Sequence, residues 1–261
     1  MQLLPLLPSH LIAVAEQWPI ERITLVPRLR WHLHTPYAHA RCIMGTHLHG
    51  VIAAVRTGRS ARITALRTLA HNATNDVHAQ LVEDLRAQLA VHACHTLTAT
   101  VPPAQVHHWR ALGFRTEEQV VRYAGGRFIE ASHDEVMPLE AQHRLALLHL
   151  DRRASGEDRS ALLLENEYLG RVYMDGRHVR GFALPLLGEG LIVADAPMVG
   201  LELQRWLFPV QDHLLLPENS AAHAHLIEHG YRKEVVGVRM VHGPALVRNA
   251  AMIFAEAFGL V

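Results

Sequence analysis

The sequence predicts an α/β (α+β) protein in which one unit of strands and helices occurs twice. Three observations support this prediction: a length of 261 residues, a repeated segment late in each half, and the same order of elements upstream of both repeats. The length fits two mid-sized domains. An apolar fraction of 49% with 19% charged residues is typical of a globular protein.

The repeated segment spans 101–126 in the first half and 216–243 in the second. In each copy a strand ends at a proline, which cannot continue a ladder, and a short helix then ends at Gly113 or Gly230. Counted from that glycine, four further positions match: Phe114 with Tyr231, Arg115 with Arg232, Arg122 with Arg239, and Gly126 with Gly243. The shared spacing favours a duplication over two unrelated strand–helix–strand units.

The elements upstream of each repeat are predicted in the same order. In the first half, strands at 40–44, 50–55 and 62–69 precede a helix at 76–93, whose apolar stripe is Val77, Leu81, Leu85 and Leu89. In the second half, strands at 171–174, 179–184 and 191–193 precede a helix at 197–208. We expect domains at 1–127 and 128–261, with a last amphipathic helix at 246–258.

Charge and composition argue against several classes of partner. Lys+Arg and Asp+Glu number 25 each, so no net field attracts nucleic acid or an anionic membrane. The N-terminal stretch lacks a basic region and is broken by Pro5 and Pro8, which predicts neither a signal peptide nor a membrane helix and favours a cytoplasmic protein. Cys42 and Cys94 are expected to be buried thiols. The three His-x-His pairs lack further ligands at a recognisable spacing, so we expect no metal.

The order of elements, ending in a helix that runs into Gly-Phe or Gly-Tyr, resembles the GNAT superfamily of N-acetyltransferases. Asn219, Ala222 and Gly230-Tyr231 match the spacing of its C-terminal motif. Leu226 stands where the motif usually has tyrosine, and Trp109 occupies that position in the first copy. The segments 150–163 and 181–190 are similar to the C-terminal domain of bacterial tandem GNAT proteins. The resemblance covers about residues 1–258.

This resemblance implies two GNAT-like domains, each a twisted, mostly antiparallel sheet flanked by helices. It implies that the N-terminal domain binds acetyl-CoA as co-substrate and that the C-terminal domain walls the pocket of a small-molecule amine acceptor. An amine would attack the thioester directly, without a covalent enzyme intermediate. The residues placed at the co-substrate are Leu66, Arg67, Thr68, Leu69, Thr74, Asn75, Val77, His78 and Trp109.

The chain departs from the family pattern at the expected phosphate loop. The stretch 68–78 contains no glycine, and Asp76 stands where the first helical turn begins. A carboxylate about 4 Å from a phosphate costs on the order of 4 kcal/mol at an effective dielectric near 20. The alternative is that Thr74, Asn75 or Asp76 caps the helix without touching phosphate.

A base is needed because an amine of pKa about 10.4 is neutral only about once in 2,500 at pH 7. The candidates are His71, His107, His108 and Glu117, and for each the alternative is an ordinary surface or interface residue. Asp151, Asp158 and Arg159 are the candidates for the acceptor side. The alternative for Asp158 and Arg159 is that they are exposed helix residues. The sequence thus favours an acyl-CoA-dependent N-acyltransferase. The alternative is a catalytically inactive GNAT-like protein that binds a ligand or a partner protein.

Overall fold

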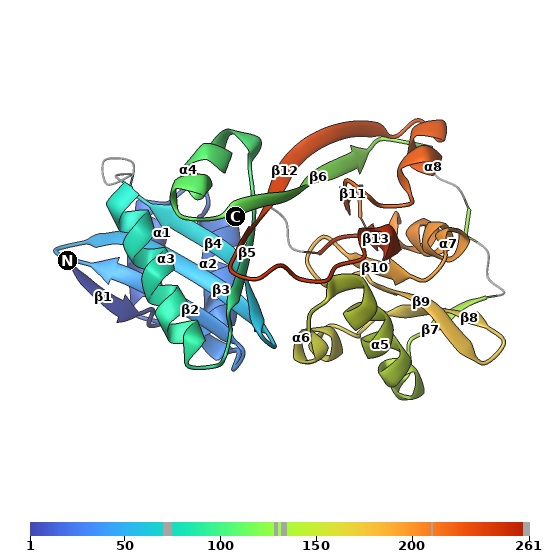
Figure 1. Cartoon of the computed structure of the whole chain (residues 1–261), viewed down its shortest axis with the longest axis horizontal. Coiled ribbons are helices and arrows are strands. Elements are labelled where there is room, and N and C mark those ends of the chain that lie inside the picture. The colour runs from blue at the N-terminus through green and yellow to red at the C-terminus, as the bar shows by residue number, and fades with distance from the viewer. Residues whose placement is uncertain (70–74, 128–129, 132–134, 210, 258–261) are drawn as a thin grey trace. The chain divides into compact units, whose positions relative to one another are not determined.

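The computed structural model describes residues 1–69, 75–127, 130–131, 135–209 and 211–257. The chain divides into two compact units, each described by itself below (Figure 1). The first unit contains Met1–Glu117 and Met240–Ala245, and the second contains Glu118–Arg239 and a stretch that begins at Leu246.

The first unit is built on a sheet with the strand order β1-β2-β3-β4-β5. Its elements are β1 (Gln2–Pro5), α1 (His10–Gln17), α2 (Arg22–His34), β2 (Ala38–Met44), β3 (Leu48–Thr57), β4 (Ser60–Thr68), α3 (Asn75–Ala90), β5 (Thr96–Val101), the 3-10 helix η2 (Pro103–Gln105) and α4 (Val106–Ala111). Neighbouring strands are antiparallel except for β4 and β5, which are parallel.

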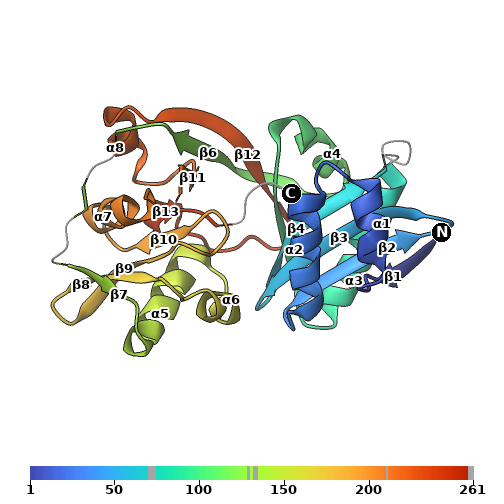
Figure 2. The ribbon, with the colours of Figure 1, turned by 180° about the vertical axis from the view of Figure 1, so that it is seen from behind.

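Helices cover both faces of this sheet. Helix α3 lies on one face, and α1 and α2 lie on the other (Figure 2). The central strand β3 is therefore buried on both sides, which explains its nearly continuous apolar run. The stripe predicted on α3 is buried, with Leu81, Leu85 and Leu89 fully covered.

Strands β4 and β5 separate along their length. They pair from Ser60 with Thr96 to Arg62 with Thr98, and the rest of both strands is unpaired between them. A register shift beside Ala53 and Ala54 of β3 leaves Thr64 as an extra residue in β4. The sheet therefore opens toward the C-terminal ends of these two strands.

The second unit contains a sheet with the order β13-β10-β9-β8-β7, antiparallel throughout, and a set of neighbouring strands β12-β6-β11. Helices α5 and α7 pack on its opposite faces (Figures 1 and 2). The elements are β6 (Arg115–Ala124), β7 (Val136–Pro138), η3 (Ala141–His143), α5 (Arg144–Ser155), α6 (Ser160–Glu165), β8 (Arg171–Asp175), β9 (His178–Leu184), β10 (Leu191–Ala194), α7 (Pro197–Leu207), β11 (His213–Pro217), α8 (His223–Glu228), β12 (Arg232–His242), η4 (Ala250–Met252) and β13 (Ile253–Ala255).

The predicted repeat is present in the structure. The series β2-β3-β4-α3-β5-α4-β6 recurs as β8-β9-β10-α7-β11-α8-β12. Gly113 and Gly230 both have positive φ, +84° and +76°, after their helices. In both copies the next amide donates to the carbonyl five residues back, Phe114 to Trp109 at 3.1 Å and Tyr231 to Leu226 at 3.0 Å.

The helix predicted at 246–258 is wrong for the residues that the structure describes there. This stretch contains only the short 3-10 helix η4 and then the strand β13, which pairs antiparallel with β10. The apolar residues Ile253 and Phe254 are buried in an extended conformation. Pairing with an available strand has overridden the helical spacing of the sequence.

No helix in the described parts of the chain combines the length and the apolar character needed to cross a membrane.

Candidate functional site

A cavity of about 700 Å³ lies in the first unit where β4 and β5 separate. Its walls come from the end of β4, from α3, from the segment that follows β5 and from the residue before α2. The lining residues are Glu21, Leu66, Arg67, Thr68, His78, Pro102, Ala104, Gln105, His107, His108 and Trp109. A second groove of about 590 Å³ between α1 and α2 is lined mostly by apolar residues, with Glu16 and His34 as its candidate bases. The cavity at β4 and β5 brings together three histidines and the separated strands, so we place the candidate site there.

A chain of hydrogen bonds joins three of the lining residues. His78 Nε2 lies 2.8 Å from Thr68 Oγ1, and His78 Nδ1 is hydrogen-bonded to His108 Nε2. The two rings meet nearly edge to face, at 69° with centroids 4.5 Å apart. Which nitrogen carries the proton depends on the tautomer of each ring.

Both of these histidines are neutral at pH 7. Burial, and then the neighbouring His108, lower the pKa of His78 from 6.5 to about 4. Burial, and then His107, lower the pKa of His108. A neutral imidazole has a lone pair, so the pair can accept a proton from a bound group.

One cation and one anion also meet at the cavity. Arg67 Nε donates to Glu21 Oε2 at 2.6 Å, and its Nη1 donates to the carbonyl of Leu66 at 2.8 Å. The two side chains are 27% and 40% exposed, so they are both paired and reachable from solvent.

Trp109 is buried at the wall of the cavity and packs edge-on against Phe114, with centroids 4.9 Å apart. It stands where the GNAT motif usually has tyrosine. Its indole N–H can donate but cannot release a proton at neutral pH, so this position offers no acid.

Seven of the residues placed at a catalytic or co-substrate site by the sequence line this one cavity: Leu66, Arg67, Thr68, His78, His107, His108 and Trp109. Leu69 and Val77 do not. Leu69 is buried, and its amide donates to the carbonyl of His49 at 3.1 Å. Val77 is buried in the apolar stripe of α3.

The remaining candidates of the first unit are outside the cavity wall or outside the described residues. Glu117 is half-buried on β6 and is not a lining residue. His71 and Thr74 lie outside the described residues, and Asn75 begins α3 with a side chain that is not described.

Sequence reasoning missed Glu21, Pro102, Ala104 and Gln105 in the wall. Glu21 is 46 residues from Arg67, and no motif spacing links the two. In the sequence, Pro102 is the proline that ends the strand of the first repeat, and nothing in its spacing indicates a site.

In the second unit, Asp151, Asp158 and Arg159 lie together along a cavity of about 370 Å³. Arg159 is buried and makes a two-pronged ion pair with Asp151, with Nε to Oδ2 at 3.0 Å. Burial opposes the charge of Arg159, but Asp151, Glu157 and Glu256 outweigh it and raise its pKa. Arg159 is thus not an exposed helix residue.

Asp158 differs from its two neighbours because it is exposed. It pairs with Arg152 at 3.0 Å, and its Oδ1 accepts from the Ser160 amide at 3.3 Å. The side chain of Ser160 is the largest cause that lowers the pKa of Asp158, and the Ser160 amide and Arg152 add to this effect. Among the described residues, no three or more His, Cys, Asp or Glu side chains are arranged to hold a metal ion.

Sequence comparisons identify no relative: no protein-family model matches the chain, and no curated protein sequence matches it. Solved structures do match. A proposed acetyltransferase from Pyrococcus horikoshii superposes with a TM-score of 0.79 at 14% identity, over 98% of this chain and 94% of its own.

Two further structures match over nearly the whole chain. A tandem GNAT protein from the clavulanic acid biosynthesis pathway has a TM-score of 0.58 at 13% identity, over 94% of this chain and 99% of its own. A GCN5-related N-acetyltransferase from Anabaena variabilis has a TM-score of 0.60 at 10% identity, over 95% of this chain and 73% of its own. The chain therefore has a tandem GNAT fold, as the sequence resemblance implies.

Proposed function

We propose that the chain is an acyl-CoA-dependent N-acyltransferase that moves an acetyl group from acetyl-CoA to a small amine by direct attack. The observation that carries this proposal is the separation of β4 from β5 beyond Arg62 and Thr98, which opens a cavity walled by two hydrogen-bonded neutral histidines.

The residues at this opening fit the thioester end of acetyl-CoA. Among the described strands, none pairs with β4 from Ile63 to Thr68 on the side of β5. The carbonyls of Thr64 and Leu66 accept from Arg28 Nη1 and Arg67 Nη1 at 2.8 Å, so an extended ligand pairs with this main chain by displacing these two side chains. Leu66 and Trp109 offer apolar contact, and the ligand supplies an activated carbonyl. The residues 70–74, expected at the phosphates, lie outside the described residues.

His108 is the residue best suited to deprotonate the acceptor. In the tautomer in which its Nε2 donates to His78 Nδ1, its Nδ1 has the free lone pair. When a proton binds there, His108 can pass its Nε2 proton to His78 Nδ1, which leaves His78 as an imidazolium whose Nε2–H donates to Thr68 Oγ1. A positioned base of this kind contributes roughly 10²- to 10⁴-fold to the rate.

Glu21 and Arg67 are suited to orient the acceptor. An approaching ammonium group can bind the carboxylate of Glu21 before it loses its proton to His108. The departing thiolate needs no acid, because a thiol of pKa about 8.5 is a good leaving group. The absence of a tyrosine at Trp109 is therefore compatible with turnover, with positioning supplying several kcal/mol.

The direct test is an assay of free thiol released from acetyl-CoA in the presence of a panel of primary amines. We expect amine-dependent release that falls at least 100-fold in His108→Gln and stays within twofold in Glu117→Gln, whose side chain does not line the cavity. No release with any amine, together with no binding of millimolar acetyl-CoA, would favour an inactive GNAT-like binding protein instead.

A further inference from the structure

The opening between β4 and β5 has a counterpart in the second unit. By the internal repeat, β10 and β11 correspond to β4 and β5. The C-terminal strand β13 occupies this place: it pairs antiparallel with β10, and the amide of Glu256 donates to the carbonyl of Leu215 on β11 at 2.7 Å. The position that is open in the first unit is therefore filled in the second.

Two buried polar side chains are directed at the main chain of β13. Gln204 Nε2 on α7 donates to the carbonyl of Phe254 at 2.6 Å. Ser220 Oγ, just after β11, donates to the carbonyl of Ile253 at 2.6 Å. Both side chains belong to buried residues, so each needs an internal partner, and the strand provides it.

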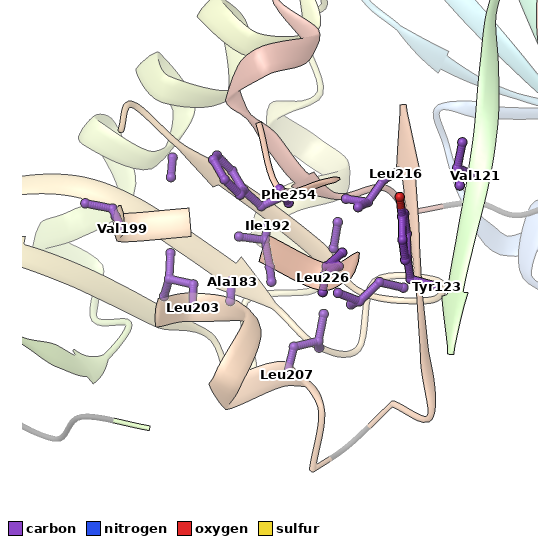
Figure 3. Packing of buried hydrophobic residues seen from close by; sticks show 14 of the residues in the cluster. Val121, Tyr123, Ala183, Ile192, Val199, Leu203, Leu207, Leu216, Leu226 and Phe254 are labelled. Carbon is purple, nitrogen blue, oxygen red and sulfur yellow. The ribbon is translucent and has the colours of Figure 1, made fainter. Parts of the chain in front are cut away.

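The side chain of Phe254 is fully buried beneath α7, in a cluster with Ile192 and Leu216 (Figure 3). Gly200 of α7 makes room for the ring, since a Cβ on Gly200 would lie 2.2 Å from the Phe254 Cγ. A glycine inside a helix is less favourable than alanine, so its presence at position 200 is explained by this close approach.

Buried charges hold the end of the strand. Glu256 is 4% exposed and lies 3.1 Å from Arg248 Nη2 and 3.9 Å from Arg239 Nη1. Breaking such a buried pair leaves an uncompensated buried charge, which is strongly destabilising. Release of β13 would expose these charges as well as Phe254.

We propose that the second unit is a strand-binding module whose occupant is the chain's own Ile253–Ala255, held in the slot that the first unit keeps open. This inference rests on the function proposed above. It means that the first unit binds one acetyl-CoA and that the second unit binds none. The slot fits an extended apolar segment with two main-chain carbonyls, an internal phenylalanine and a following carboxylate.

The test is hydrogen exchange of the full chain, read in peptides that cover 250–257. We expect slow exchange there in the native protein and at least tenfold faster exchange in Gly200→Ala, with α3 unchanged. In Gly200→Ala the new methyl group clashes with the ring of Phe254, and Phe254→Ala removes that ring. The double variant Gly200→Ala/Phe254→Ala should therefore exchange more slowly than expected from adding the effects of the two single substitutions. Met198→Ala, an 83% exposed position on the same helix, is the matched control and should not differ from the native chain.

If Gly200→Ala does not fold, Phe254→Leu provides the same readout with a milder change. Exchange at 250–257 as fast as in an exposed loop, or strictly additive effects of Gly200→Ala and Phe254→Ala, would overturn the assignment. Two acetyl-CoA molecules bound per chain would also overturn it. No binding of acetyl-CoA would overturn the function proposed for the first unit, while the exchange result would still decide the strand assignment.

Discussion

His78 and His108 are hydrogen-bonded through Nδ1 and Nε2, although 30 residues separate them in the sequence. His78 comes from α3 and His108 from α4, so the contact depends on both helices packing beside the opening of the sheet. Thr68, at the end of β4, is hydrogen-bonded to the other ring nitrogen of His78 and completes this series of hydrogen bonds. The following predictions test what this arrangement and its surroundings do.

The acid side of the pH profile should report on His108. Burial, and then His107, lower the pKa of His108, so kcat/KM should begin to fall at a lower pH than it would with a free imidazole as the base. His107 contributes to the lowering, so His107→Gln should move this fall to higher pH with little change at pH 8. A profile that is identical in His107→Gln and in the native chain, measured from pH 5 to 8, would argue against His108 as the base.

Glu21→Gln should affect acceptor binding more than stability. The pair with Arg67 is partly exposed, and such pairs contribute about 1 kcal/mol or less to folding. We expect an acceptor KM at least tenfold higher, the KM for acetyl-CoA within twofold, and a Tm within a few degrees of the native value. An unchanged acceptor KM would remove Glu21 from the binding surface.

Folding stability should fall with acidification through His32, which is buried between Arg28 and Thr64. Its ring bonds the carbonyl of Arg28 at 2.7 Å and Thr64 Oγ1 at 2.8 Å, and burial lowers its pKa from 6.5 to about 4. As the pH falls, His32 takes up a proton in the unfolded chain at a higher pH than in the folded chain. The contribution of neutral His32 to the free energy of unfolding is therefore full above pH 6.5 and is lost toward pH 4.

Between pH 7.5 and pH 5, this effect of His32 lowers the free energy of unfolding by about 2 kcal/mol. Urea unfolding at the two pH values measures it. In His32→Gln this part of the pH dependence should disappear, even though the variant is less stable at pH 7.5. An equal loss in both proteins would contradict the assignment.

A fragment of residues 1–127 should not fold cooperatively, because the first unit includes Met240–Ala245. The carbonyl of Pro244 accepts from Thr96 Oγ1 at 2.9 Å, and that of Gly243 accepts from Arg115 at 2.7 Å. A Cβ on Gly243 would lie 2.1 Å from the carbonyl oxygen of His95, so Gly243→Ala in the full chain should also lower the Tm. Gly176→Ala, which meets no neighbour, controls for the loss of a glycine with positive φ. A fragment that unfolds sharply at the native Tm would refute this prediction.

The repeat, the fold class and most elements could be predicted from the sequence because each depends on local chemistry. Gly113 and Gly230 end their helices, and the spacing of Leu81, Leu85 and Leu89 marks the buried face of α3. Most of the cavity wall could be placed only through the resemblance to the GNAT superfamily, which assigns the co-substrate to the end of β4 and to residues of α3 and α4.

Long-range pairing could not be predicted in this way. The strand β13 has the apolar spacing of a helix, and only the vacant edge of β10 selects the extended form. The pairing of Glu21 with Arg67 and the inclusion of Met240–Ala245 in the first unit likewise depend on residues far apart in the sequence.

Calorimetric titration of acetyl-CoA into the full chain tests whether the opening between β4 and β5 is the co-substrate site. We expect one site per chain, with an affinity lowered at least tenfold by Thr68→Tyr, which places a ring at the cavity wall, and unchanged in Arg152→Ala, which lies on the second unit. Binding that is indifferent to Thr68→Tyr, or no heat at millimolar ligand, would contradict it.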